Sequence, residues 1–190
     1  MQSDPFPFLL AADWGQSDRL ISALDEPDAA AAQKQTVIGL LGQMIAVDAI
    51  PRLTTALKDP DPAVVQSAAT ALGTIGHEDG IPALLALFKT GTPDQHRAAA
   101  VGLGRLAPLH PASEIVPAFI AALPGESVPN QILLVRALGK TTDRQVLGPL
   151  KALHRSVLKQ VRSDSSSELK ELLASLGIAL DGFDGVHTEE

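Results

Sequence analysis

The 190-residue sequence has no cysteine and no tyrosine, and aromatic residues make up only 3% of it. Without cysteine there can be no disulfide framework, thiolate metal site or cysteine redox centre. No apolar run reaches the roughly 18 residues that a membrane-spanning helix needs, and the N-terminus lacks the charged region of a signal peptide. We therefore expect a cytoplasmic protein that does not enter a membrane.

Charge is distributed unevenly along the chain, whose net charge is -7. Residues 1–61 hold nine acidic and four basic residues, and residues 163–190 hold seven acidic residues and one basic residue. Residues 89–162 instead hold ten basic and four acidic residues. Because a nucleic-acid binder is expected to be basic overall, the total charge makes nucleic acid an unlikely partner.

Residues 48–76 show the pattern of two short antiparallel helices. In the first half Ile50, Leu53 and Leu57 recur at helical spacing. The segment Asp59-Pro60-Asp61-Pro62 then ends one helix and starts the next, since proline cannot continue an interior hydrogen-bond ladder but fits the first turn. The second helix carries an apolar stripe with a glycine that permits close approach, at Ala68, Ala69, Leu72, Gly73 and Ile75.

This pattern recurs along the chain. A step of 31 residues carries nine positions onto equivalent ones without a gap: Ile50, Pro51, Leu53, Pro62, Ala68, Ala69, Leu72, Gly73 and Ile75 onto Ile81, Pro82, Leu84, Pro93, Ala99, Ala100, Leu103, Gly104 and Leu106. A further step of 35 residues carries the pattern onto Pro117, Phe119, Leu134, Val135, Leu138 and Gly139. A hairpin of about 30 residues cannot bury its own apolar face, so we expect stacked copies.

The repeats predict a division of the chain into hairpins and end caps. The hairpins are 17–44, 48–76, 79–107 and 114–140, with a partial fifth at 143–162. Residues 1–16, which include Trp14, are expected to form a hydrophobic N-terminal cap. Residues 163–178 are predicted to be a C-terminal capping helix, and residues 179–190 an acidic flexible tail.

The Ile-Pro-x-Leu first helix, the Pro-Asp turn and the Ala-Ala-x-x-Leu-Gly second helix resemble the short HEAT-like repeat of phycobilisome lyase subunits and related α-solenoid proteins. The resemblance covers roughly residues 17–155. It implies an all-α fold, a right-handed superhelix of four to five hairpins. It also implies that the second helix of each hairpin lines the concave face.

We find no pattern of catalytic or metal-binding residues. His77-Glu78 invites comparison with a HEAT-type di-iron hydroxylase that uses several His-Glu pairs, but only one such pair occurs here. Gly102 and Gly104 fall within a predicted helix, whereas a phosphate-binding loop needs glycines in a strand-to-helix turn. The sequence therefore predicts no catalytic residue, no metal site and no cofactor.

The candidate site is the exposed side of the second helices. Positions 66, 70 and 74 lie opposite the buried stripe, and the repeats align them into three ladders. The ladders are Gln35, Gln66, Arg97 and Ile132; Gly39, Thr70, Val101 and Arg136; and Gln43, Thr74, Arg105 and Lys140. We expect a partner-binding groove that is neutral and polar at its N-terminal end and basic at its C-terminal end.

The next helix continues the basic trend. Its secondary basic stripe consists of Lys151, Arg155, Lys159 and Arg162, at spacings of four, four and three residues. The acidic tail lies close in sequence, so we expect it to compete with an acidic partner for this end of the groove, through Asp181, Asp184, Glu189 and Glu190.

These features favour a non-catalytic scaffold or assembly factor that binds an acidic surface of another protein. The resemblance implies an alternative, a phycobiliprotein lyase-type subunit that assists bilin attachment, and cationic side chains would suit the propionates of a bilin. A HEAT-like DNA repair glycosylase is disfavoured, because it needs aromatic and acidic residues at the centre of a strongly basic groove. Here Trp14 stands outside the repeats.

Overall fold

The computed structural model describes residues 16–24, 26, 29–164 and 166–184, and these residues form helices and turns without a strand. The α helices are α1 (Gln16–Ala23), α2 (Ala31–Gln43), α3 (Ile50–Ala56), α4 (Pro62–Ile75), α5 (Ile81–Thr90), α6 (Pro93–Leu106), α7 (Ile115–Ala122), α8 (Val128–Leu138), α9 (Leu147–Ser163) and α10 (Ser167–Asp184). Short 3-10 turns lie at Val47–Ala49, Glu78–Gly80, Leu123–Gly125 and Arg144–Val146. The predicted all-α solenoid is confirmed.

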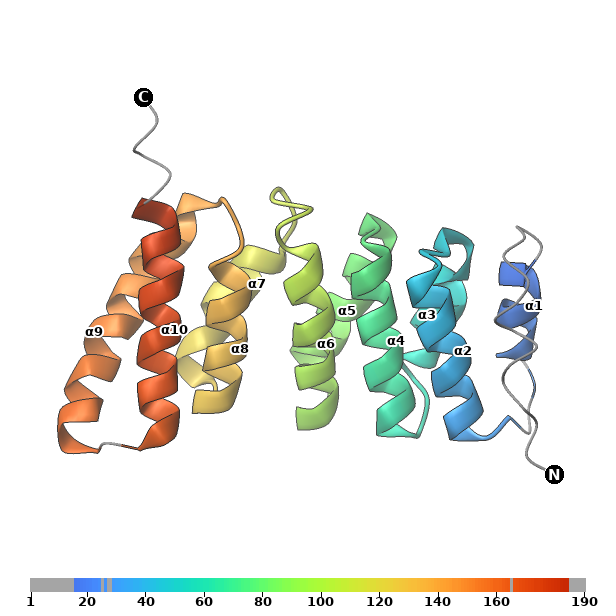
Figure 1. The fold of residues 1–190 in the computed structure, drawn as a ribbon, viewed down its shortest axis with the longest axis horizontal. Coiled ribbons are helices and arrows are strands. Elements are labelled where there is room, and N and C mark those ends of the chain that lie inside the picture. Colours follow the sequence, from blue (N-terminus) through green and yellow to red (C-terminus); the bar gives the residue numbers. More distant parts are fainter. Residues whose placement is uncertain (1–15, 25, 27–28, 165, 185–190) are drawn as a thin grey trace.

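The helices stack in two layers (Figure 1). The even-numbered helices α2, α4, α6, α8 and α10 stand side by side in front, and α3, α5, α7 and α9 lie behind them. Each even-numbered helix packs against the next one along the row. We call the outer surface of the five even-numbered helices the B face.

The predicted turn chemistry sets the helix boundaries. The Asp61 carboxylate accepts a hydrogen bond of 2.8 Å from the backbone N–H of Ala63, and Pro62 is the first residue of α4. This cap satisfies one of the donors that have no partner within the helix. The helix α4 ends at Gly76, whose φ of 75° is a left-handed conformation that glycine adopts without strain.

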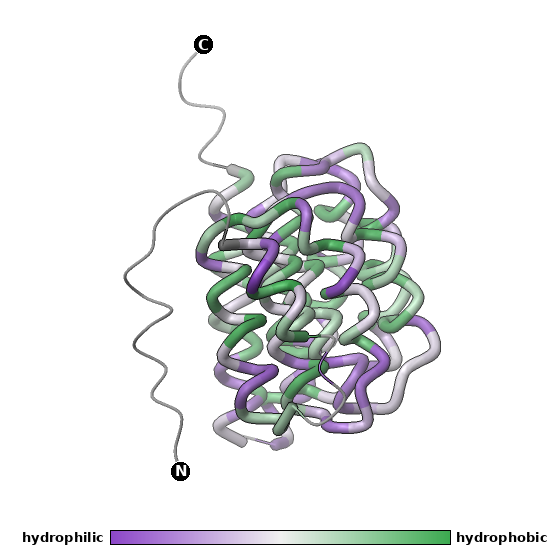
Figure 2. The backbone as a smooth tube through the Cα atoms, turned by 90° about the vertical axis from the view of Figure 1, so that its right-hand side faces the viewer, coloured by the Kyte–Doolittle hydropathy of each residue, from purple (hydrophilic) through white to green (hydrophobic). Residues whose placement is uncertain are grey.

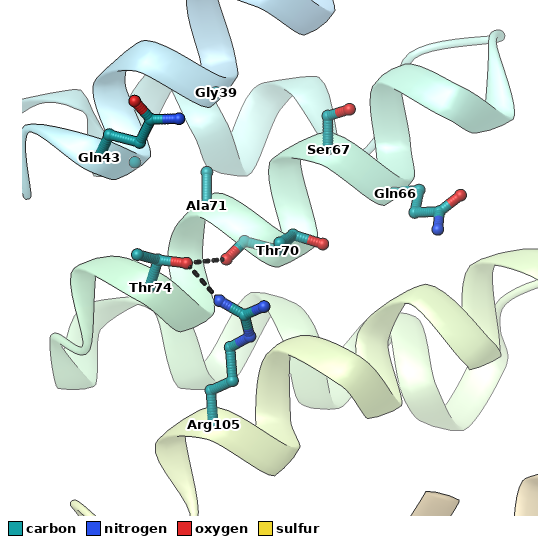
Figure 3. Close-up of a pocket in the computed structure, with 9 residues that line it drawn as sticks. Gly39, Gln43, Gln66, Ser67, Thr70, Ala71, Thr74 and Arg105 are labelled. Carbon is teal, nitrogen blue, oxygen red and sulfur yellow. Dashed lines mark hydrogen bonds between the residues drawn. The ribbon is translucent and has the colours of Figure 1, made fainter.

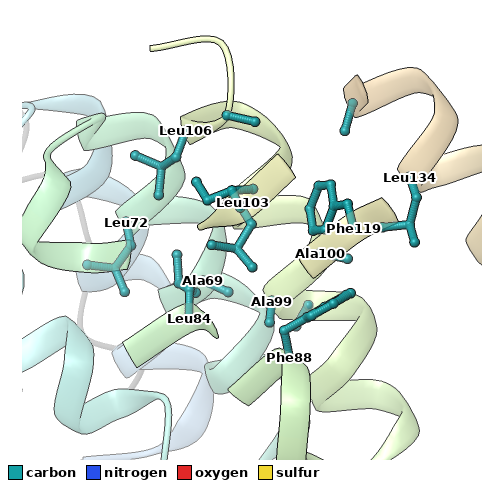
Figure 4. Packing of buried hydrophobic residues seen from close by; sticks show 14 of the residues in the cluster. Ala69, Leu72, Leu84, Phe88, Ala99, Ala100, Leu103, Leu106, Phe119 and Leu134 are labelled. Atoms are coloured by element: carbon teal, nitrogen blue, oxygen red, sulfur yellow. The ribbon is translucent and has the colours of Figure 1, made fainter. Parts of the chain in front are cut away.

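The core lies between the two layers (Figure 4). Leu72 and Leu103, which occupy equivalent positions in successive repeats, are 1% and 0% exposed. Phe88 and Phe119 from the back layer belong to the same core, with ring centroids 5.2 Å apart. Figure 2 looks along the stack and shows apolar and polar residues interspersed along the helices, as expected when a helix buries one side.

Small residues bring successive even-numbered helices together. A β carbon added to the repeat glycine of each would lie between 2.7 and 3.1 Å from an atom of the next helix, in the pairs Gly42–Ala71, Gly73–Gly102, Gly104–Ala137 and Gly139–Ala179. Distances below 3.0 Å, as at Gly73 and Gly139, are essentially never seen for real β carbons, and those at Gly42 and Gly104 are tighter than most real contacts. The repeat glycine therefore lies at a close contact between adjacent hairpins.

The C-terminal end differs from the prediction. Instead of a cap followed by a flexible tail from residue 179, α10 continues to Asp184 and packs against both α8 and α9, so that α9 and α10 form a full hairpin. Ala179 is 4% exposed, and Leu180 and Phe183 pack against the core, which extends the apolar stripe of the helix past residue 178. The predicted N-terminal cap up to residue 15 and the tail residues 185–190 lie outside the described residues.

In the described part of the chain, none of the helices combines the length and apolar character needed to cross a membrane.

Candidate partner-binding groove

The B face is hollowed between α2, α4 and α6 (Figure 3). This depression, which we call the α2–α4–α6 hollow, has a volume of about 460 Å³. Its lining consists of Gly39, Gly42, Gln43, Gln66, Ser67, Thr70, Ala71, Thr74 and Arg105. Six of these nine residues are positions of the three predicted ladders, contributed by three successive repeats. The structure therefore gathers the N-terminal half of the ladders around one hollow.

Arg105 is fixed at the rim of this hollow. Its Nη1 donates a hydrogen bond of 2.7 Å to the hydroxyl oxygen of Thr74, which lies one repeat of 31 residues earlier in the chain. The Thr74 hydroxyl in turn donates to the carbonyl oxygen of Thr70 at 2.9 Å. The stem of Arg105 lies over Gly73, where an added β carbon would stand 3.2 Å from the arginine Cδ. Both the stem and the head group are thus held in place.

The basic C-terminal end of the groove is partly neutralised. Arg136 on α8 donates to the Glu171 carboxylate on α10 at 2.9 Å, with both side chains more than half exposed. No acidic residue was expected on this face, because the repeat pattern predicts residues 163–178 to be a cap outside the repeats. Arg97, Arg105 and Lys140 are exposed and form no ion pair with any described residue.

Two other ladder positions are less exposed than a polar groove would require. Ile132 was expected on the exposed side of α8, but it is only 7% exposed and belongs to the core. Helix α8 is flanked by both α6 and α10, which leaves fewer of its positions open. Val101 is half-buried. The first ladder therefore ends at Arg97.

The secondary basic stripe lies on a different surface. All four of its side chains are exposed, at Lys151, Arg155, Lys159 and Arg162. They belong to α9, which lies in the back layer at the end of the stack, while α10 takes the last place on the B face (Figure 1). The stripe is therefore not a continuation of the ladders. Asp181, expected in a flexible tail, lies instead on α10 with its side chain exposed.

Sequence reasoning missed a partly buried pair between α6 and the turn before α8. His96 Nε2 lies 2.8 Å from Glu126 Oε1, with the two side chains 19% and 15% exposed. His96 Nδ1 donates to the carbonyl oxygen of Phe88 at 2.6 Å, and Asn130 donates to the other Glu126 oxygen at 2.8 Å. The two residues are 30 positions apart in the chain, and no sequence signal links them. Within the described residues, no group of three or more His, Asp or Glu residues is arranged to hold a metal ion.

A further ion pair joins the first two repeats. Lys34 Nζ on α2 lies 2.9 Å from Asp59 Oδ2 in the turn before α4. Burial raises the pKa of Asp59. The hydrogen bonds from Lys34 and from the backbone N–H of Asp61, together with the Lys34 charge, lower this pKa by more than burial raises it. The pKa of Asp59 therefore lies below its usual 3.8. This pair is a contact between repeats and lies outside the hollow.

Residues 17–104 match the family of HEAT repeats. The matched segment runs from α1 into the last turn of α6 and contains most of the α2–α4–α6 hollow. No curated protein matches the chain. The match covers just under half of the chain, and the stacked hairpins over these residues agree with it, so this part of the chain is similar to HEAT repeats. HEAT repeats are in general scaffolds for protein interaction.

Proposed function

We propose that this protein is a non-catalytic scaffold that binds an acidic surface of another protein on its B face. The observation that carries the proposal is the set of three exposed cations, Arg97, Arg105 and Lys140, which have no carboxylate partner among the described residues. Arg97 and Arg105 project from α6, and Lys140 lies in the turn that follows α8. Cations that form no internal ion pair remain available to an external anionic group.

The packing of the repeats suits this role. Alanine and glycine contacts hold α4 and α6 close together, so the side chains between them need little reordering on binding. Binding costs less when the receptor side chains are already ordered. The unpaired cations would also steer an acidic partner toward this face, an effect screened over about 8 Å at physiological ionic strength.

The test compares two charge reversals of equal size. In the B-face variant Arg97, Arg105 and Lys140 become Glu, and in the control Lys151, Arg155 and Lys159 on α9 become Glu. Binding of fluorescein-labelled poly-glutamate is followed by anisotropy at low and high salt. We expect the B-face variant to lose most of the binding seen at low salt and the α9 variant to keep most of it. Equal losses of binding in both variants would mean that binding depends only on the net charge of the protein, which would contradict the proposal.

The lyase-type alternative remains a prediction, since the HEAT-repeat match concerns the repeat and not bilin chemistry. A bilin that binds protein changes its conformation and protonation, and its visible absorption changes with them. Titrating the protein into biliverdin therefore separates the two functions. Saturable spectral change that disappears in the B-face variant would favour the lyase-type subunit over the scaffold.

A further inference from the structure

We infer that the α2–α4–α6 hollow is a binding site for a single carboxylate of the partner, seated on the Arg105 guanidinium. The inference rests on the proposed function and assigns one part of the B face a specific ligand group. Arg105 lines the hollow, whereas Arg97 and Lys140 do not. Those two residues supply charge, whereas Arg105 has a defined space beside it.

Gly39 leaves room for the ligand. The equivalent positions in the next three repeats are Thr70, Val101 and Arg136, each of which carries a side chain. A β carbon built on Gly39 would meet no atom within 4 Å. The hollow of about 460 Å³ lies within the range of roughly 300–1,000 Å³ that is common for ligand sites. The space therefore exists because the first repeat lacks a side chain at this ladder position.

The Arg105 head group still has donors to offer. A guanidinium carries five N–H donors in one plane, and Arg105 uses one of them, at 2.7 Å to Thr74. No Asp or Glu lines the hollow. A planar carboxylate is the acceptor that matches two adjacent guanidinium donors, and such bidentate pairs are stronger than neutral hydrogen bonds. Since Thr74 already orients the head group, little rotational freedom is lost when the anion binds.

The rest of the lining suits a polar chain segment. Gln43 and Gln66 are exposed at the hollow and carry amide groups that both donate and accept hydrogen bonds. Such groups pair with the peptide bonds on either side of an acidic residue. The site thus fits a carboxylate on a polar polypeptide, either an Asp or Glu side chain or a C-terminal carboxylate.

The decisive variant fills the hollow without changing charge. In Gly39→Leu the new side chain enters open space, and leucine has a helix propensity about 1 kcal/mol better than glycine. Helix α2 should therefore form as before. Gly148→Leu on α9 is the matched control, since a β carbon there also meets nothing within 4 Å. Arg105→Lys keeps the charge but removes the bidentate geometry, and Arg105→Gln removes both.

Three short peptides serve as probes for the ¹⁵N-labelled protein in NMR titrations. Acetyl-Gly-Ser-Asp-Ser-Gly-amide carries a side-chain carboxylate. The same peptide with Asn for Asp carries none, and the Asn peptide with a free C-terminus carries only the terminal carboxylate. We expect a carboxylate peptide to shift the amide signals of Gly39, Thr70 and Thr74 and the Arg105 Nε–H signal. The peptide that shifts them at the lower concentration identifies the source of the carboxylate.

Gly39→Leu and Arg105→Gln should each raise the apparent Kd at least tenfold, and Arg105→Lys several-fold, while Gly148→Leu leaves it unchanged. Equal shifts with the uncharged Asn peptide, or binding by Gly39→Leu as tight as by the unchanged protein, would overturn the inference. Should Gly39→Leu fail to fold, the two Arg105 variants decide the outcome. If poly-glutamate still needs the B-face cations while the hollow variants have no effect, only this inference fails. If poly-glutamate binds the B-face variant as tightly as the unchanged protein, the proposed function fails as well.

Discussion

The carbonyl oxygen of Gly102 lies 2.7 Å from the point where a β carbon on Gly73 would stand. The two glycines belong to α4 and α6 and mark the crossing of adjacent repeats. The obstacle is backbone, since the Gly102 Cα is also only 2.9 Å away. A backbone atom cannot move aside as the end of a flexible side chain can. The distance between these two helices is therefore set by the absence of a side chain.

Gly73→Ala should consequently lower the free energy of unfolding by about 1 to 3 kcal/mol, the usual cost of overpacking, even though alanine is the better helix former. Gly39→Ala is the control, because its β carbon meets nothing within 4 Å and should add up to about 1 kcal/mol. Urea unfolding followed by circular dichroism measures both changes. A Gly73→Ala protein as stable as Gly39→Ala would show that the helices separate easily.

Asp59→Asn should remove a stabilising contact that depends on pH. The folded-state pKa of Asp59 is below its ordinary value of 3.8, so its contribution is complete above about pH 4 and is lost as the pH falls through the folded-state pKa. At pH 7 we expect a loss of about 2 kcal/mol, typical of a hydrogen bond to a charged group. Below pH 4 the difference between the two proteins should shrink, as measured by urea unfolding at several pH values. Asp181→Asn, at an exposed site, should change stability by less than about 0.5 kcal/mol throughout.

The repeat pattern was predictable because it depends on local spacing. A step of 31 residues placed Thr74 and Arg105 in one ladder, and the structure joins these two side chains by a hydrogen bond. The buried roles of Leu72 and Leu103 follow from the same alignment and are confirmed. Stacked hairpins keep equivalent positions in register, so residues that are one repeat apart in the sequence are neighbours in the structure.

The features that the sequence did not predict depend on contacts between residues that the repeat pattern does not relate to each other. Helix α9 ends without a Pro-Asp turn, which hid the pairing of Glu171 with Arg136 one repeat step away. The contact of His96 with Glu126 depends on the path of the turn before α8. The hollow beside Gly39 reflects a missing side chain, and its volume follows only from the placement of the helices around it.

Ile45 has a backbone conformation that is unfavourable for a β-branched residue. Its φ of 54° is left-handed, and the equivalent position one repeat later is Gly76. The Ile45 side chain is 58% exposed, so burial offsets little of the strain. We expect Ile45→Gly to raise the free energy of unfolding by about 1 kcal/mol, since a left-handed conformation costs an ordinary residue about 1 to 2 kcal/mol. Thermal and urea unfolding should both show the gain.

Val47→Gly is the control for that prediction. Val47 is also exposed, at 42%, but it has no left-handed conformation to relieve. This substitution should be neutral or destabilising, because glycine makes the unfolded chain more flexible. A loss of stability in Ile45→Gly similar to that in Val47→Gly would mean that the Ile45 side chain contributes more through its contacts than its backbone costs.

The pair formed by His96 and Glu126 should stabilise the fold through coupling between the two side chains. Both ring nitrogens of His96 face oxygen acceptors, and the ring stacks on Phe88 with centroids 4.1 Å apart. Removing either partner leaves a partly buried polar group without its counterpart, which is costly. In a double-mutant cycle with His96→Ala and Glu126→Ala, urea unfolding should therefore give an interaction energy of about 1 to 3 kcal/mol.

The chain supplies an exposed pair for comparison. Lys89 Nζ lies 3.8 Å from Glu114 Oε2, with the side chains 57% and 79% exposed. Water screens such a pair and its side chains lose entropy when they meet, so a cycle with Lys89→Ala and Glu114→Ala should give less than about 0.5 kcal/mol. If the His96–Glu126 cycle gave a value as small as this one, the two side chains would be neighbours without mutual stabilisation. The contact between α6 and the turn before α8 would then depend on apolar packing, to which Phe88 on α5 and Phe119 on α7 contribute. Phe119→Ala should in that case be the more damaging change by several kcal/mol.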